Sequence, residues 1–186
     1  NGWVADDMLE KLNSIGGSHT KNDFKNSRPE WLKPITQNYR NIKIHECPPN
    51  GQGIVALIIL GILEHFNVKN MSKNDYIHLF CEAVKIGYFL RDQYLADIHY
   101  NKLSVKSFLS KKSLKQYASK IDFNKAKIYD KSLFPDHSDT IYLTVRDKNG
   151  MTISFINSLF DPFGSGITAP RSGVLFHCRG RGFNLI

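Results

Sequence analysis

The sequence is poor in cysteine and has no hydrophobic run long enough to cross a bilayer. Its 186 residues include three cysteines, Cys47, Cys81 and Cys178, and none of them forms a Cys-x-x-Cys pair. This argues against a disulfide framework and a zinc site, and predicts buried free thiols. The longest apolar run, Gly53 to Leu63, is well short of the ~20 residues of a membrane-spanning helix. We therefore expect no disulfide, no metal site and no membrane span in this segment.

Acidic residues are fewer than basic ones, and the formal net charge is +8. The excess lies mainly between residues 102 and 131, and such a charge can indicate a nucleic-acid-binding surface. Lysine-rich segments are more often solvated helix faces or linkers, however, and no nucleic-acid-binding motif accompanies this one. We therefore expect no nucleic-acid partner.

Apolar side chains recur at helical spacing in residues 3–15, 53–66, 73–94 and 104–121. Gly16 and Gly17 would end the first helix, and Ser72 would cap the third. The third helix is expected to turn its inward face through Tyr76, Phe80, Val84, Gly87 and Leu90. Beyond residue 122 the periodicity disappears, which predicts a loop as far as residue 138.

Two segments alternate between apolar and polar residues with the period of a strand. Residues 34–47 would form a strand pair. Residues 140–156 would form a half-buried hairpin, because Asn149-Gly150 accepts the positive φ angles of a tight turn. A glycine loop at residues 163–166 would then lead into a third strand, Gly173 to His177.

The second hairpin also carries a recognisable sequence. From Asp139 to Gly166 it resembles the start of the small subunit in the gamma-glutamyltranspeptidase family of N-terminal nucleophile hydrolases. In that family a threonine opens a strand pair that a Phe-Gly-Ser-Gly loop follows, as Thr140 and residues 163–166 do here. The similarity continues into Ser172 to Leu175 and Arg179-Gly180.

Earlier in the chain, Cys47 to Gly53 and Leu90 to Asp97 resemble parts of the family's large subunit. The resemblance implies that residues 1–139 are the C-terminal part of a mostly helical large-subunit-like region, with a linker at about 122–139. Residues 140–186 would be the N-terminal part of a small-subunit-like region. Together they would form one structural domain of α+β class, part of the αββα sandwich of the N-terminal nucleophile hydrolases.

The resemblance implies that Thr140 is a nucleophile that acts twice. Its hydroxyl would first attack the carbonyl of Asp139, so that the chain cleaves itself between these two residues. The α-amine released at Thr140 would then serve as general base for the hydroxyl, which is too weakly acidic to attack an amide unaided. Ser158 stands where the family has a hydroxyl that hydrogen-bonds the nucleophile; the alternative is a strand-end serine with a local hydrogen bond.

Three positions that bind the substrate's amino group in glutamyl-specific members differ here. They hold Phe160, Arg179 and Gly182 in place of an asparagine, a glutamine and an aspartate. Loss of the anionic partner weakens glutathione as the substrate, since charge-assisted hydrogen bonds contribute ~1.5–3 kcal/mol each. Arg179 would bind a carboxylate instead, which suits acylase-like members; its alternative role is an ion pair within the fold.

Four glycines have expected structural roles. Gly164 and Gly166 would let the backbone approach the sheet closely. Gly51 and Gly53 precede the apolar helix, where free amides could bind an anion. The alternative is that they let this loop pack closely against the hairpin, because their spacing is not that of a phosphate-binding loop.

These features predict an autoprocessing amidase or acyltransferase of the glutathione hydrolase type, with a small amide as substrate and no cofactor. One alternative is an acylase-like member acting on another amide, and another is a catalytically silent fragment that binds a partner through its basic segment. We interpret the chain as an internal fragment, since the family's carboxylate-binding arginine and oxyanion hole would lie outside it. Alone it should therefore be inactive, and its exposed apolar surface should favour self-association.

Overall fold

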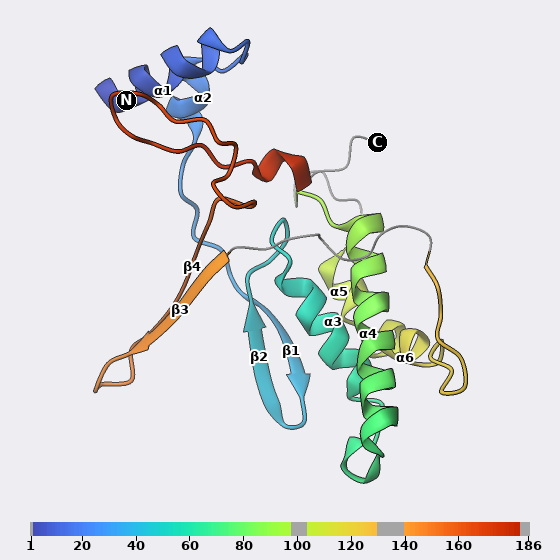
Figure 1. Cartoon of the computed structure of the whole chain (residues 1–186). Coiled ribbons are helices and arrows are strands. Elements are labelled where there is room, and N and C mark those ends of the chain that lie inside the picture. The colour runs from blue at the N-terminus through green and yellow to red at the C-terminus, as the bar shows by residue number, and fades with distance from the viewer. Residues whose placement is uncertain (1, 98–103, 130–139, 183–186) are drawn as a thin grey trace. The chain divides into compact units, whose positions relative to one another are not determined.

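The structure, a computed structural model, describes residues 2–97, 104–129 and 140–182 (Figure 1). The chain divides into two compact units. One is Trp31–Phe134, and the other combines Asn1–Glu30 with Pro135–Ile186. Helices and antiparallel hairpins occur together along the chain, which confirms the predicted α+β class. The division into large- and small-subunit-like regions stays a prediction.

The unit Trp31–Phe134 begins with the first predicted hairpin. Strand β1 (Ile35–Tyr39) pairs antiparallel with β2 (Ile42–Glu46). The two residues between them, Arg40 and Asn41, both have positive φ, 48° and 66°, as a two-residue hairpin turn requires. The Arg40 amide donates a 2.9 Å hydrogen bond to Glu64 Oε2, which ties the turn to the end of the next helix.

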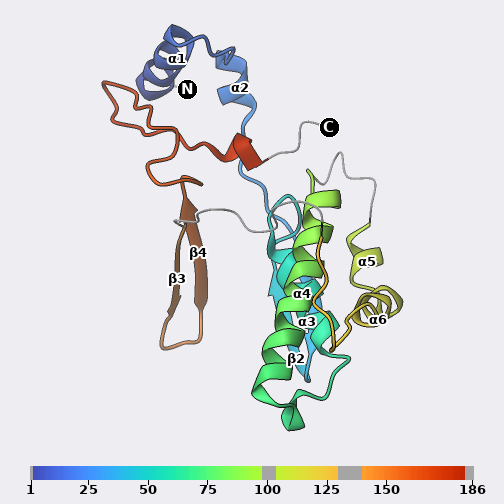
Figure 2. The same cartoon turned by 45° about the vertical axis from the view of Figure 1, so that its right-hand side comes forward.

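Helices build the rest of this unit: α3 (Gly53–Leu63), the 3-10 helix η1 (Val68–Asn70), α4 (Lys73–Tyr94), α5 (Val105–Phe108) and α6 (Lys111–Ala118). Helix α3 packs against the β1–β2 hairpin, α4 and α6 (Figure 1, Figure 2). Fully buried Ile62 and Leu79 lie at the centre of the resulting apolar core. Small residues bring the helices close, because a Cβ at Gly61 would lie 2.7 Å from Leu114 Cδ1. No helix in the described ranges is both long and apolar enough to span a membrane.

The buried face of α4 differs from the predicted one. The structure buries Leu79, Ala83, Ile86, Gly87 and Leu90. Gly87 and Leu90 were predicted correctly and Val84 is half-buried, but Tyr76 and Phe80 are 42% and 44% exposed. The close contact with α3 explains the difference, because a Cβ at Gly87 would lie 2.9 Å from Ile59 Cγ1 and such packing favours small or aliphatic neighbours over rings.

A carboxylate, Glu82, is also buried on α4. Its Oε1 accepts a 2.7 Å hydrogen bond from Lys85 Nζ, and its Oε2 accepts a 3.2 Å bond from the backbone amide of Lys127. Lys85 Nζ also donates to the Lys127 carbonyl. The buried charge is thus paired and hydrogen-bonded, as burial requires. It fastens the segment after α6 to the middle of α4.

Ser72 caps α4 as the sequence predicts, with its Oγ accepting a 3.1 Å hydrogen bond from the Asp75 amide. We expect Ser72→Ala to lower the free energy of unfolding by about 1 kcal/mol, because a helix amide loses its partner. Urea unfolding followed by circular dichroism measures this change. Ser107→Ala is a control at an exposed serine, and equal destabilisation by both variants would contradict the capping role.

The second unit begins with two helices, α1 (Trp3–Ser14) and α2 (Lys21–Asn26). The predicted glycine end of α1 is confirmed: the amides of Gly16 and Gly17 donate to the carbonyls of Asn13 and Leu12. At the start of α2 the Asp23 carboxylate accepts hydrogen bonds from the amide and hydroxyl of Thr20. Both helix boundaries therefore follow from local hydrogen bonds.

The second predicted hairpin is also present. Strand β3 (Thr140–Arg146) pairs antiparallel with β4 (Thr152–Ser158), and Gly150 at the turn has a φ of 89°. The prediction that these strands are half-buried is wrong for the described residues, because every side chain from Thr140 to Arg146 is exposed. Alternation determines which side chains share a face, but it does not determine what covers that face.

The predicted third strand, Gly173 to His177, is not formed. Residues 163–178 instead make a long loop, here called the 163–178 loop, whose two arms hydrogen-bond through Ser165 N to Phe176 O and Ala169 N to Val174 O. Gly164 has a φ of 55°, and a Cβ there would collide with the Phe176 carbonyl. The backbone pairs within the loop, so it does not add to the β3–β4 sheet. A 3-10 helix, η2 (Arg179–Gly182), follows.

Candidate active site

Thr140 and Ser158 lie directly opposite each other at the open end of the β3–β4 hairpin. Thr140 Oγ1 donates a 3.0 Å hydrogen bond to Ser158 Oγ. The threonine is exposed and the serine is half-buried, so the pair is open to a substrate on one side. Asp139, the other residue of the predicted cleavage bond, lies outside the described residues.

Ser158 connects the threonine to the residues that follow. Its Oγ also accepts a 3.0 Å hydrogen bond from the Phe160 amide. Its carbonyl oxygen accepts a 2.9 Å bond from Arg179 Nη2. Since both bonds fix the backbone around residue 158, they hold the serine hydroxyl in place beside Thr140.

The three residues predicted to bind substrate gather around this serine. The Arg179 guanidinium lies 5.7 Å from the centre of the Phe160 ring, a cation–π distance. A Cβ at Gly182 would lie 3.0 Å from Phe160 Cζ, so the glycine leaves space for the ring. Phe160 has a φ of 83°, which is uncommon for a bulky residue and is typical of strained functional positions.

Arg181 and Arg179, which both follow the 163–178 loop, differ in their polar partners. Asp161 forms an ion pair with Arg181, and the Cys178 thiol also lies 3.4 Å from that carboxylate. Within the described part of the chain, Arg179 contacts no carboxylate, and its side chain is exposed. An exposed guanidinium next to a nucleophile can receive the carboxylate of a ligand.

The base of the 163–178 loop brings these residues together. Cys178 N donates a 3.1 Å hydrogen bond to the Leu159 carbonyl, so the chain returns alongside the end of β4 just before Arg179. Sequence reasoning did not single out Asp161, Arg181 or this return. The separation of 20 positions between Asp161 and Arg181 hides their ion pair from sequence reasoning, because the pair depends on the course of the intervening loop.

The other predicted glycines belong to the unit Trp31–Phe134. A Cβ at Gly53 would lie 2.8 Å from Glu46 Cβ, so its absence lets the start of α3 pack against β2. Near this turn, Arg91 Nε and Asp92 Oδ1 form an ion pair at 2.7 Å. Arg91 Nη1 also donates to Gln52 Oε1 at 3.2 Å. The roles proposed for Gly51 and Gly53 in an anion site stay predictions.

The cysteines and lysines show simpler roles. All three cysteines are free, and Cys47 and Cys81 are exposed, so the prediction of buried thiols is wrong for these two.

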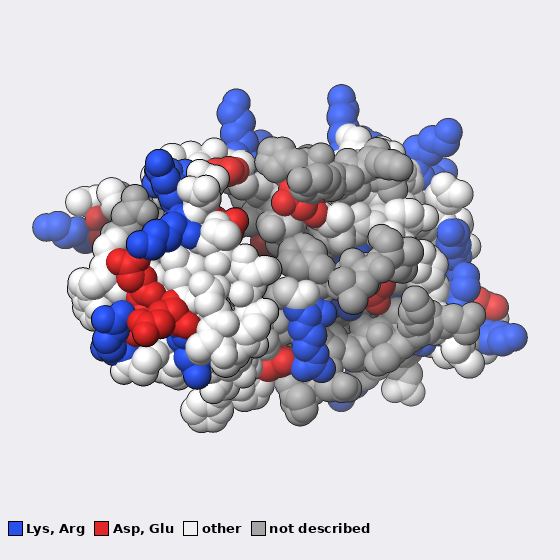
Figure 3. Space-filling view, turned by 90° about the horizontal axis from the view of Figure 1, so that it is seen from above, with Lys and Arg blue, Asp and Glu red and all other residues white. Residues whose placement is uncertain are grey.

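Lys111, Lys112 and Lys115 occupy the exposed face of α6. In the view of Figure 3, lysine and arginine side chains are spread over several places rather than gathered in one patch. In the ranges that the structure describes, no three His, Cys, Asp or Glu side chains are arranged to hold a metal ion.

Comparison with known proteins agrees with the family resemblance of the sequence. The family model described as Gamma-glutamyltranspeptidase matches residues 1–185. The chain is 34% identical over 186 residues to the glutathione hydrolase-like YwrD proenzyme of Bacillus subtilis (strain 168), covering 99% of this chain and 35% of the relative. It is 28% identical over 184 residues to the oxamate amidohydrolase proenzyme of Klebsiella pneumoniae, covering 99% and 34%.

Solved structures agree with the sequence matches. The crystal structure of cephalosporin acylase from Bacillus halodurans is similar with a TM-score of 0.84 and 33% identity, over 98% of this chain and 33% of that one. Helicobacter pylori gamma-glutamyltranspeptidase matches 68% of this chain and 37% of its own, with a TM-score of 0.63 and 25% identity. These matches confirm the predicted fold. The chain spans about a third of the length of the relatives that it matches.

Proposed function

This chain belongs to the gamma-glutamyltranspeptidase family, and we propose that Thr140 is the nucleophile of an autoprocessing enzyme that hydrolyses or transfers amide-bound acyl groups. The observation that carries the proposal is the 3.0 Å hydrogen bond from Thr140 Oγ1 to Ser158 Oγ. Relatives named as glutathione hydrolase, acylase and amidohydrolase proenzymes support the same class of reaction.

The first proposed step is self-cleavage. Thr140 Oγ1 attacks the carbonyl carbon of Asp139, the peptide C–N bond breaks, and the acyl group moves from nitrogen to oxygen. Water then hydrolyses the ester, which leaves a carboxylate on Asp139 and a free α-amine and hydroxyl on Thr140. The exposed position of Thr140 at the start of β3 suits this reaction, because water must reach the ester.

In the second step the mature threonine acts on a substrate. Its α-amine, with a pKa of about 8, takes the hydroxyl proton as Oγ1 attacks the substrate carbonyl. The amine then protonates the leaving nitrogen, and water or another amine releases the acyl group from the threonine ester. The hydrogen bond to Ser158 would hold the Thr140 hydroxyl in one orientation, so that less conformational freedom is lost when it attacks.

The acyl group that we propose ends in a carboxylate and needs no amino group. The exposed Arg179 guanidinium supports this, since it donates to the carbonyl of Ser158, the partner of Thr140, and contacts no carboxylate among the described residues. Phe160, whose ring lies under the guanidinium, has no side-chain hydrogen-bond acceptor for a substrate ammonium group. The similarity to a cephalosporin acylase supports an acylase activity. Glutathione hydrolysis is the second candidate, because relatives carry that name.

A matched pair of anilides tests the acyl preference in a polypeptide of the relatives' full length. Gamma-glutamyl anilide carries an ammonium group, and glutaryl anilide is the same acyl group without it. We expect glutaryl anilide to have the higher kcat/KM, and Arg179→Ala to lower it roughly 10-fold or more, since a charge-assisted bond is lost. Pentanoyl anilide, which lacks both charges, is the control and should be insensitive to Arg179→Ala. Activity confined to the glutamyl compound would contradict the proposal.

A further inference from the structure

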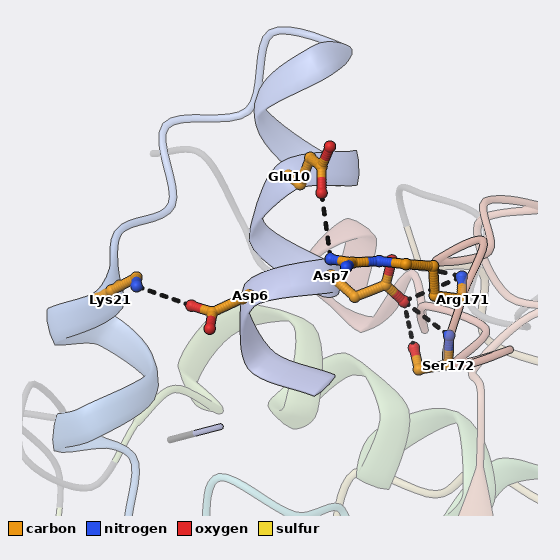
Figure 4. A network of polar contacts seen from close by, with 6 residues as sticks. All are labelled: Asp6, Asp7, Glu10, Lys21, Arg171 and Ser172. Atoms are coloured by element: carbon orange, nitrogen blue, oxygen red, sulfur yellow. Dashed lines mark hydrogen bonds and ion pairs between the residues drawn. The ribbon is translucent and has the colours of Figure 1, made fainter. Parts of the chain in front are cut away.

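A carboxylate on α1 is buried against the 163–178 loop. Asp7 has a side chain that is 1% exposed, although it lies on a helix whose neighbours are mostly exposed. Figure 4 shows α1 turning Asp7 towards Arg171 and Ser172, with Glu10 one turn further along the helix. Nothing in the proposed chemistry at Thr140 uses this group, so its burial requires another explanation.

The tip of the loop is shaped to receive this carboxylate. Asp7 Oδ2 accepts 2.7 Å hydrogen bonds from both the amide and the hydroxyl of Ser172. The Arg171 amide and Nε also donate to the carboxylate, at 3.2 Å each. Two consecutive amides that point at one anion form a concave site of the kind that binds anions in many proteins.

The balance of charge and burial is favourable for the ionised form. Burial raises the pKa of Asp7, but the hydrogen bonds from Ser172 and Arg171 outweigh it and lower the pKa to about 2. Glu10 adds a 3.2 Å ion pair to Arg171 Nη2, but it is 77% exposed. Exposed pairs contribute little, so the buried Asp7 contact dominates this network.

This contact joins residues from opposite sides of the bond that is proposed to be cut. Asp7 precedes the bond proposed to be cut, whereas Arg171 and Ser172 follow it. We propose that Asp7 is an anchor that holds the two polypeptides together after cleavage between Asp139 and Thr140, by occupying the amide site at the tip of the 163–178 loop. This inference rests on the proposed self-cleavage. The partner of α1 is thus the second polypeptide, which carries the threonine.

The tip of the 163–178 loop is preorganised to bind Asp7. Ala169 N bonds to Val174 O and Gly173 N to Ala169 O, so the tip is held in shape by its own hydrogen bonds. Gly173, with a φ of 70°, completes the turn. A preformed site loses little conformational entropy on binding, which favours association of two separate chains.

The anchor can be tested independently of self-cleavage. A recognition sequence for a site-specific protease is placed just before Thr140 in a Thr140→Ala background, so that the chain is cut only by the added protease. We expect the cut pieces to elute together in size-exclusion chromatography. Asp7→Ala should weaken their association roughly 30-fold or more, because Arg171 and Ser172 lose a buried charged partner. The dissociation constant is measured by dilution of a fluorescently labelled piece.

Glu10→Gln is the matched control on the same helix face and should change the dissociation constant less than about fivefold. Circular dichroism of the uncut variants checks that α1 is intact. If Asp7→Ala proves unfolded, Asp7→Asn, which keeps the shape but not the charge, replaces it. Pieces that separate with Asp7 intact, or an equal effect of both substitutions, would overturn the anchor. Absence of self-cleavage in the Thr140 protein would overturn the proposed function instead.

Discussion

In a polypeptide of the relatives' full length, Thr140→Ala is expected to leave the chain uncut and to lower amide hydrolysis roughly 10⁴-fold or more, the scale of removing a catalytic nucleophile. The alanine has no oxygen to attack the Asp139 carbonyl, so neither the ester nor the new N-terminus can form. Intact mass of the purified protein, followed by N-terminal sequencing of any smaller product, measures the cut directly. We expect two pieces from the full-length parent, the second beginning Thr-Ile-Tyr-Leu.

Two further variants separate chemistry from folding in this experiment. Thr140→Ser keeps the hydroxyl and should still cleave, while Ser158→Ala keeps the nucleophile but removes its 3.0 Å partner and should cleave more slowly. Because the chain spans about a third of its relatives, the comparison is made both on this chain and on a polypeptide of the relatives' full length. An uncut mass for the full-length parent would refute the nucleophile assignment.

The largest expected effect on stability comes from Leu79 in α4. This side chain is completely buried in the core of the unit Trp31–Phe134, so Leu79→Ala should lower the free energy of unfolding by about 2–5 kcal/mol. The adjacent Phe80 is larger but 44% exposed, and Phe80→Ala should cost less. Urea denaturation of both variants measures the difference. A greater loss with Phe80→Ala would mean that α4 buries the face that the sequence pattern predicts.

The sequence predicts the order of elements well because local signals determine it. The cap at Ser72, the glycines after α1 and the turn residues Arg40 and Asn41 each act within a few positions of the chain. The rotation of α4 depends instead on how closely α3 approaches at Gly87, which periodicity cannot encode. For the same reason the sequence indicates the length of this helix but only part of its buried face.

The candidate site was accessible to sequence reasoning only through family resemblance. Thr140 and Ser158 have no local signal of their own, and their contact follows from the hairpin register. The positive φ of Phe160 and its contact with Arg179 depend on the return of the chain at Cys178. Asp7 was missed because its partners lie more than 160 residues away along the chain. Such contacts require the folded arrangement.

The buried carboxylate of Glu82 suggests how this part of the chain can change during evolution. Its partners are one side chain, Lys85, and the main-chain amide of residue 127. A main-chain donor is present whichever amino acid occupies position 127, except proline. A substitution at position 127 other than proline therefore keeps this hydrogen bond. Loss of Glu82, in contrast, removes the shared acceptor of Lys85 and of the residue 127 amide.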